Sequence, residues 1–361
     1  MKSSQHQARK TKIKPKRSIV VRGIFTPYTG YGQQVCDFVS MLQSRGVDVK
    51  SRPICVDEAY GNVSSEIKST FVHREQIEDW ELIIHPPSFE DELTGKKKRI
   101  IYTMWETDRL PDRIVKLLNT YEGIIVPSDW CLGVFKKSGV KAPLFLVPLG
   151  IDTAIYKPQT STLPEDCIFG CAGRLAHGGI RKGINQIISA FLQAFPPGVN
   201  DVMLRVKAFQ DCALIPYNDP RIQVTKAYIS EKSMVDWYHS LTCFVSASTA
   251  EGWGLHQQEA MACGKAVLNV NYGGVKMFFD PPANGYTLKH HIEQCSAKVY
   301  DGVGMWAAPS ELNLIEQMQH IYQNRVECFL RGRDAITSAT QFTKEKTIDG
   351  ILSVMAKLGA L

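Results

Sequence analysis

Short hydrophobic runs alternate with amphipathic segments along most of the chain. Runs of about four to eight apolar residues bounded by turn residues are typical of buried strands, whereas apolar residues at spacings of three and four are typical of helices. The predicted strands lie at 18–25, 48–55, 82–85, 99–105, 124–126 and 144–147, and then at 168–172, 202–206, 222–228, 243–248 and 266–270. Strands that alternate with helices in this way predict an α/β protein with parallel sheets.

The alternation is interrupted once, between residues 153 and 166, where Pro158 and Pro164 break a stretch without pattern. We interpret 153–166 as a linker. It separates an N-terminal Rossmann-like domain at 18–152 from a C-terminal Rossmann-like domain at 167–335, and residues 309–358 are expected to be mostly helical. A chain of 361 residues that is 44% hydrophobic is long enough for two such domains.

Two glycines follow the first predicted strand in a turn-rich loop at 26–32. Gly30 and Gly32 precede apolar residues at helical spacing, which begin at Val35. Strand, glycine-rich loop and helix are the opening of a Rossmann-like half, in which such a loop binds phosphate. A tight turn that needs positive φ would explain the same two glycines, so both interpretations stay open here.

The net charge of +6 is concentrated at the N-terminus. Residues 1–17 contain no acid and seven bases, Lys2, Arg9, Lys10, Lys12, Lys14, Lys16 and Arg17, and subtracting these seven charges leaves −1 for the rest. We expect a disordered, solubilising tail. Weak attraction to an anionic membrane surface is the alternative. Nucleic-acid binding is not expected, because no aromatic residue interleaves the charges.

Cysteine usage and hydropathy bear on the compartment. The ten cysteines are scattered, without a Cys-x-x-Cys pair or a His–Cys metal spacing. Unpaired cysteines favour a reducing compartment. No apolar run approaches about 18 residues, so neither a membrane span nor a signal peptide is expected. The sequence thus predicts a cytoplasmic protein, with peripheral contact to the inner membrane face if the tail binds lipid.

Candidate functional residues are concentrated in the stretch 249–264. It is predicted to be a glycine-rich loop and a short helix that follow the strand at 243–248. Glu251 lies in the predicted loop, Glu259 lies on the helix eight positions later, and Gly264 follows as a helix stop. The N-terminus of a helix behind such a loop presents free backbone N–H groups and a partial positive charge to an anion. Two carboxylates beside it can accept hydrogen bonds from sugar hydroxyls.

This stretch resembles the E-x7-E signature of the retaining glycosyltransferases of family 4, which have the GT-B fold. The matching positions are Glu251, Gly252, Trp253, Gly254, Leu255, Glu259, Ala260, Met261, Ala262 and Gly264, and the chain departs at His256, where proline is common. A surface helix with two solvated carboxylates would share the spacing but not the ten matches. The resemblance implies two Rossmann-like doubly wound domains facing a central cleft, and a last helix, 336–361, that crosses back onto the N-terminal domain.

The resemblance also implies roles for individual residues. It implies that Glu251 binds the hydroxyls of the donor sugar and that Glu259 binds the ribose diol. It also implies that Arg174 and Lys182 are the cations that hold the diphosphate. Residues near the donor are expected to be Gly30, Gly32, Gly252, Trp253, Gly254 and Leu255. No Asp-x-Asp metal motif is present, so we expect no metal and no cofactor besides the substrate, a nucleotide-diphosphate sugar such as a UDP- or GDP-sugar.

Glu106 is a further candidate for the active site. It follows the strand predicted at 99–105, and functional groups in doubly wound sheets lie at the carboxyl ends of strands. Relatives often have a histidine at this place, so Glu106 is a candidate substitute for it. His85 also follows a strand, but we expect it to be a buried structural histidine.

Together these features predict a metal-independent, retaining hexosyltransferase of glycan biosynthesis. It would transfer sugar from a nucleotide-diphosphate donor to a glycan, lipid-linked or small-molecule hydroxyl. A GT-B nucleotide-sugar epimerase would need acid–base groups for epimerisation rather than this E-x7-E wording. A non-catalytic sugar-binding scaffold would not need Arg174, Lys182, Glu251 and Glu259 all to be present.

Overall fold

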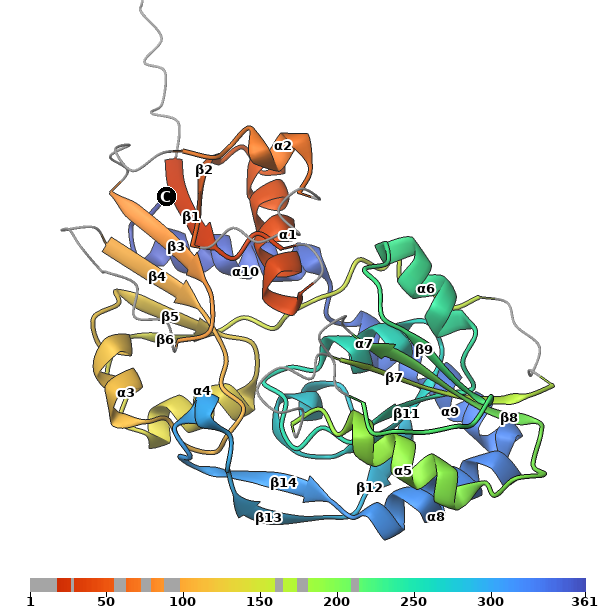
Figure 1. The fold of residues 1–361 in the computed structure, drawn as a ribbon. Helices are drawn as coiled ribbons and strands as arrows, with labels where there is room; N and C mark the ends of the chain where they lie inside the picture. The colour runs from red at the N-terminus through yellow and green to blue at the C-terminus, as the bar shows by residue number, and fades with distance from the viewer. Residues whose placement is uncertain are drawn as a thin grey trace, which may run out of the picture.

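The computed structural model describes residues 18–26, 29–54, 63–72, 79–87, 98–159, 165–173, 181–208 and 214–361. In this part of the chain, two parallel sheets of six strands each lie side by side, with a separate antiparallel pair of strands (Figure 1). The predicted tail, 1–17, lies outside the described residues. Among the helices that are described, none is long and apolar enough to cross a membrane.

The N-terminal sheet has the strand order β2-β1-β3-β4-β5-β6. Every residue of β3 and β5 is buried, as expected for central strands covered on both faces. The strands are β1 (Ser18–Gly23), β2 (Asp48–Pro53), β3 (Trp80–Ile84), β4 (Lys98–Tyr102), β5 (Gly123–Val126) and β6 (Leu144–Leu146). Helices α1 (Gly30–Ser44), α2 (Ser65–Lys68), α3 (Asp112–Leu118) and α4 (Asp129–Lys137) lie between them in the chain.

The C-terminal sheet repeats this plan with the order β12-β11-β10-β7-β8-β9. Its strands are β7 (Cys167–Gly173), β8 (Val202–Ala208), β9 (Ile222–Thr225), β10 (Cys243–Ser246), β11 (Ala266–Val270) and β12 (Gly285–Leu288). The connecting helices are α5 (Ile184–Ala194), α6 (Glu231–His239), α7 (Leu255–Ala262) and the 3-10 turn η3 (Gly273–Met277). The predicted α/β class with two doubly wound sheets is confirmed.

Strand order fixes where ligands can bind. In the C-terminal sheet β10 lies beside β7, although two strands separate them in the chain, and in the N-terminal sheet β3 lies beside β1. At such a switch point the connections leave in opposite directions and open a crevice at the carboxyl ends of the strands. The loops after β1, β3, β7 and β10 are therefore the ones expected to hold a ligand.

The C-terminal helices carry the chain back to the first half. After α8 (Glu311–Gln323) and α9 (Arg325–Thr340), α10 (Lys344–Lys357) lies beside the N-terminal sheet (Figure 1). Ile348 and Ile351 of α10 are fully buried in the same apolar core as β1 and β3. The expected return of the last helix is therefore confirmed.

The chain passes between the two halves twice, near residue 151 and near residue 343, and these two segments pack directly against each other. The backbone N–H of Ile151 donates to the carbonyl of Phe342 at 3.2 Å, and that of Lys344 donates to the carbonyl of Ile151 at 3.1 Å. A Cβ at Gly150 would lie 2.0 Å from the carbonyl carbon of Thr343. Only glycine allows this approach.

Two features differ from the sequence-based prediction. Helix α1 begins at Gly30 rather than near Val35, because the Thr29 side chain accepts from the Gly32 N–H at 3.1 Å and caps the helix. The region 285–309, for which no strand was predicted, contains β12, β13 (His290–Gln294) and β14 (Met305–Pro309). Strand β13 is largely exposed and polar, so it lacks the alternation that identifies a strand.

The close approach of Gly150 to Thr343 predicts that a larger residue at position 150 destabilises the protein. We expect Gly150→Ala to lower the free energy of unfolding by about 1–3 kcal/mol, the usual cost of forcing an extra methyl group into a packed site. Gly133→Ala is the matched control, because Gly133 is exposed in α4 and a Cβ there meets nothing within 4 Å. That control should gain about 0.5–1 kcal/mol. Denaturant unfolding measures both, and equal stability of the two variants would contradict the close approach.

Candidate active site

The loop between β10 and α7 carries Glu251, and tight backbone packing holds it in place. Gly254 directly precedes the first residue of α7 and has φ +103°. Residues that carry a side chain rarely adopt this backbone conformation. A Cβ at Gly252 would lie 2.7 Å from the Cβ of Met104, which follows β4 in the other half of the molecule. The Ser128 hydroxyl donates to the Gly252 carbonyl at 2.8 Å. The N-terminal half therefore contacts the backbone next to Glu251.

A second loop, after β7, brings two cations to this carboxylate. Lys182 Nζ lies 2.5 Å from Glu251 Oε1, and Arg181 Nη1 lies 3.3 Å from Glu251 Oε2. Arg181 also donates to the Ala250 carbonyl at 2.9 Å. Gly183 ends this loop with φ +62° and packs against Ala247, so α5 starts beside the end of β10. Because β7 and β10 are neighbours in the sheet, their loops meet.

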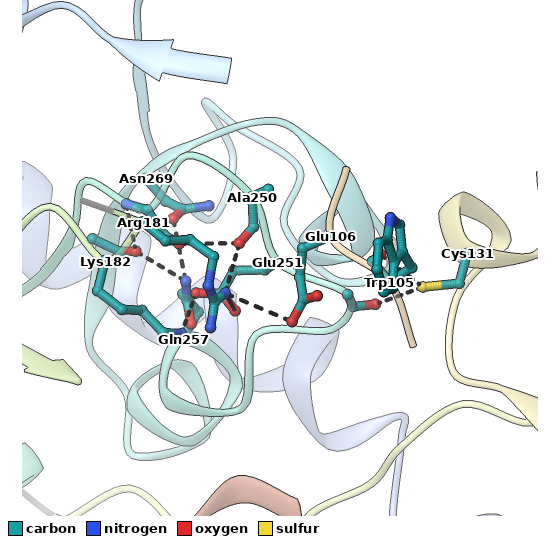
Figure 2. Close-up of polar contacts among 12 residues, drawn as sticks. Trp105, Glu106, Cys131, Arg181, Lys182, Ala250, Glu251, Gln257 and Asn269 are labelled. Atoms are coloured by element: carbon teal, nitrogen blue, oxygen red, sulfur yellow. Dashed lines mark hydrogen bonds and ion pairs between the residues drawn. The ribbon is translucent and has the colours of Figure 1, made fainter. Parts of the chain in front are cut away.

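Glu106 reaches the same cations from the N-terminal half. Figure 2 shows Arg181 close to Glu251 and Glu106, and its Nη1 lies 3.8 Å from Glu106 Oε1. Glu106 also lies close to the hydroxyl group of Tyr300, whose ring packs edge-on against Trp105 at 5.2 Å. The predicted site residues Glu106, Lys182 and Glu251 thus lie together.

The charges in this cluster shift the pKa values of both carboxyl groups. Burial opposes ionisation of Glu251, but the charges of Lys182 and Arg181 outweigh it and lower the pKa to about 2. Burial raises the pKa of Glu106 above its ordinary range, and the Arg181 charge opposes this only in part. Glu251 is therefore ionised at neutral pH, and two cations face one permanent anion.

These pKa shifts have opposite consequences for stability. The folded-state pKa of Glu251 lies below its ordinary value, so ionised Glu251 contributes stability above that value, and the contribution is lost as the pH falls toward 2. The raised pKa of Glu106 means that ionising this carboxyl costs stability as the pH rises. When Glu106 is protonated, Arg181 and Lys182 face only the one charge of Glu251, and a bound anion would offset the remaining positive charge.

The glycines predicted near a donor surround the start of α7. Gly30, the first residue of α1, lies opposite Leu255, and a Cβ on Gly30 would be 3.7 Å from Leu255 Cδ1. Gly32 allows the carbonyl of Thr26 to approach, because a Cβ there would lie 1.9 Å from that oxygen. The N-termini of α1 and α7 thus approach each other across the two halves. Such N-termini favour anions.

Two other predicted residues, Trp253 and Glu259, occupy different surroundings. The Trp253 side chain is buried, donates to Gln258 Oε1 at 2.7 Å and packs against Phe342, so only its backbone adjoins the Glu251 loop. Glu259 lies farther along α7, where its Oε2 accepts from the Tyr238 hydroxyl at 2.6 Å. Arg174 lies outside the described residues.

His85 is buried, as the sequence analysis expected. Its Nδ1 lies 2.8 Å from the carbonyl oxygen of Pro86, and its ring lies 6.3 Å from that of Tyr31.

Sequence reasoning missed Arg181 and Tyr300. Arg181 directly precedes Lys182, so inspection of the residues around the predicted lysine could have found it. Tyr300 comes from the connection between β13 and β14 and has no local signature. This segment lies on the N-terminal half, where Met305 and Asp108 exchange hydrogen bonds of 2.7 and 3.1 Å and Arg113 pairs with Asp301 at 2.6 Å.

The arrangement suits recognition of a polyhydroxylated anion. Arg181 and Lys182 provide positive charge, the helix N-termini provide free N–H groups, and Glu251 can accept hydrogen bonds from hydroxyl groups. In the described ranges, no group of three or more His, Cys, Asp or Glu side chains is placed to hold a metal ion.

Comparisons with known proteins agree with this geometry. A family model for "Glycosyl transferases group 1" matches residues 221–301, which include both glutamates. The chain is 24% identical over 198 residues to the lipopolysaccharide core biosynthesis mannosyltransferase LpcC of Rhizobium leguminosarum bv. viciae. This match covers 50% of each protein, so it spans about half the length of that relative.

Solved structures match nearly the whole chain. Sucrose-phosphate synthase from Thermosynechococcus elongatus superposes with a TM-score of 0.69 and 13% identity, covering 95% of this chain and 99% of that one. Anabaena HepE, solved in complex with UDP and glucose, gives a TM-score of 0.63 and 13% identity, covering 94% and 100%. Together, the matched domain and the shared fold support a GT-B glycosyltransferase.

Proposed function

We propose that the protein is a retaining, metal-independent glycosyltransferase of family 4. It transfers a hexosyl group from a nucleotide-diphosphate sugar to a hydroxyl of a glycan, a lipid-linked or a small-molecule acceptor. The observation that carries this proposal is the pairing of Arg181 and Lys182 with Glu251 at the switch point of the C-terminal sheet, opposite Glu106. The mannosyltransferase relative and the neighbour solved with UDP and glucose support a nucleotide-sugar donor.

The donor diphosphate would bind between the cations and the helix N-termini. Negative charge grows on the diphosphate as its bond to the sugar breaks, and fixed positive groups stabilise that charge. Lys182 has three N–H donors and uses one on Glu251, so it retains donors for a phosphate oxygen. Arg174 is proposed as a further cation. Glu251 would accept hydrogen bonds from the sugar hydroxyls, and Glu259 from the ribose.

The acceptor would approach from the side of Glu106. In a front-face reaction, the acceptor oxygen bonds to the anomeric carbon on the face that the diphosphate leaves, and the hydroxyl proton passes to a diphosphate oxygen. The configuration is thereby retained. Ionised Glu106 would orient the attacking hydroxyl by accepting its hydrogen bond, and Tyr300 lies beside this carboxyl. We propose a cytoplasmic location, with the basic tail as a possible contact to the inner membrane face.

Product analysis separates this function from its alternatives. A thermal-shift panel of UDP, GDP and ADP would first identify the base, because a ligand at 100 times its Kd adds about 2.7 kcal/mol of stability. The matching sugar donors are then incubated with and without acceptors. Transfer or slow donor hydrolysis with retained configuration supports the proposal. An epimerised nucleotide sugar would indicate an epimerase, and binding without turnover a scaffold.

Replacing Lys182 tests the leaving-group role. Lys182→Met keeps the apolar stem and removes the charge, so turnover at saturating substrates should fall about 100- to 1000-fold, as for loss of one preorganised donor. Donor affinity should fall much less, because the charge that Lys182 meets is largest in the transition state. Lys136→Met, on the exposed face of α4, is the control. A folded Lys182→Met protein with near-parent turnover would refute this role.

The raised pKa of Glu106 predicts a pH effect. If Glu106 must be ionised, kcat/KM of the parent should decline as the pH falls through a value above the ordinary glutamate pKa of about 4.3. Glu106→Gln cannot ionise, so it should be slower and should lack this acidic limb, while nucleotide affinity is retained. Steady-state rates across pH measure this, with the exposed Glu66→Gln as control. Parent-like rates in Glu106→Gln would remove Glu106 from the mechanism.

A further inference from the structure

A second polar cluster lies along α7, beyond the cations that would hold the diphosphate. The Tyr238 hydroxyl of α6 lies 2.6 Å from Glu259 Oε2 and 2.9 Å from His256 Nδ1. His256 Nδ1 lies 3.2 Å from the same Glu259 oxygen. Tyr156, in the segment that leads from the first half to the second, lies close enough for the charge of Glu259 to act on its hydroxyl group. His256 is the position at which the chain departs from the E-x7-E wording.

The hydrogen bonds assign the protons in this cluster. An ionised carboxylate only accepts, so the single Tyr238 hydrogen goes to Glu259 in the short contact. His256 Nδ1 then faces a tyrosine oxygen and a carboxylate oxygen, both acceptors, and must carry a proton itself. In a neutral imidazole the other nitrogen, Nε2, is therefore an acceptor.

Exposure shows which of these groups can meet a ligand. Tyr238 is fully buried, whereas the His256 side chain is 36% exposed and that of Glu259 is 15% exposed. Within the described part of the chain, Nε2 of His256 has no hydrogen-bond partner. Glu259 Oε2 receives bonds from Tyr238 and His256, and a carboxylate has about four acceptor sites. One acceptor on each of two adjacent side chains is thus left for a ligand.

Two neighbouring acceptors match a vicinal diol, whose two hydroxyls both donate. They do not match a metal ion, because only two candidate ligands are present and the protonated Nδ1 faces the carboxylate. His256 and Glu259 lie three residues apart on one helix face, with Cβ atoms about 5–6 Å apart. His256 follows Leu255, where the N-termini of α1 and α7 meet. The pair therefore continues along α7 from the place where the diphosphate would bind.

We propose that His256 is a specificity residue for the ribose and that its Nε2 accepts one hydroxyl of the diol while Glu259 accepts the other. This inference rests on the proposed function, since it needs a nucleoside diphosphate on α7. Tyr238 holds the carboxylate so that the two acceptors stay side by side.

The test is calorimetric titration of the full chain with the nucleoside diphosphate that binds best among UDP, GDP and ADP, and with its 2′-deoxy and 3′-deoxy forms. The parent should bind both deoxy forms more weakly than the ribonucleotide. His256→Phe keeps the ring but removes the acceptor, so affinity for the ribonucleotide should fall about 2- to 12-fold, as for one neutral hydrogen bond. Discrimination against one of the two deoxy forms should then disappear, and discrimination against the other should remain.

This loss of discrimination separates recognition from a structural effect. A merely destabilised helix would weaken the ribonucleotide and both deoxy forms equally. His291→Phe, at an exposed histidine of β13, is the control and should match the parent. If His256→Phe keeps both discriminations, or if the parent does not distinguish the deoxy forms, the inference is overturned and the proposed function stands. If the parent binds none of the nucleoside diphosphates, the proposed function itself fails.

Discussion

The pairing of Glu251 with Arg181 and Lys182 is the interaction on which the rest of the site depends. Two adjacent cations in a buried place repel each other and lose hydration, and a carboxylate between them offsets both costs. The pairing also fixes the direction of both cations before any ligand binds. Because Glu251 is ionised at neutral pH, the cluster keeps one uncompensated positive charge whenever Glu106 is protonated. An anionic ligand would meet cations that are already oriented.

This pairing extends to the other half of the molecule through several short contacts. Ser128 and Cys131, at the start of α4, both donate to the carbonyl of Gly252, next to Glu251. The single hydrogen of the Cys131 thiol is shared with the carbonyl of Trp105, 3.5 Å from the sulfur, and Figure 2 shows this contact beside Glu106. The connection between β13 and β14 adds Tyr300 on the far side. The site is thus assembled from both sheets, so its geometry depends on how the two halves are held together.

Helix α7 organises the candidate site along its length. Its N-terminus, made possible by the left-handed conformation of Gly254, lies beside the Glu251 loop and opposite α1. His256 in the first turn and Glu259 three residues later lie on one face, with Tyr238 behind them. Under the proposed function, one short helix would contact both the diphosphate and the ribose of the donor. A helix is suited to this because it holds its side chains at fixed spacings of about 1.5 Å along its axis.

The sequence by itself determined the features that depend on local periodicity and local turn chemistry. Strand and helix alternation predicted the two parallel sheets, and the loop and helix at 249–264 were found where the pattern predicted them. Only the tertiary structure showed that Arg181 pairs with Glu251, 70 positions later, that Tyr300 lies beside Glu106, and that Tyr238 donates to Glu259. These partners come from different strands, helices and halves of the molecule. The spacing of apolar residues, two in a strand and three or four in a helix, encodes which face of an element is buried. Contacts between distant loops arise from strand order and packing, which a single sequence does not display.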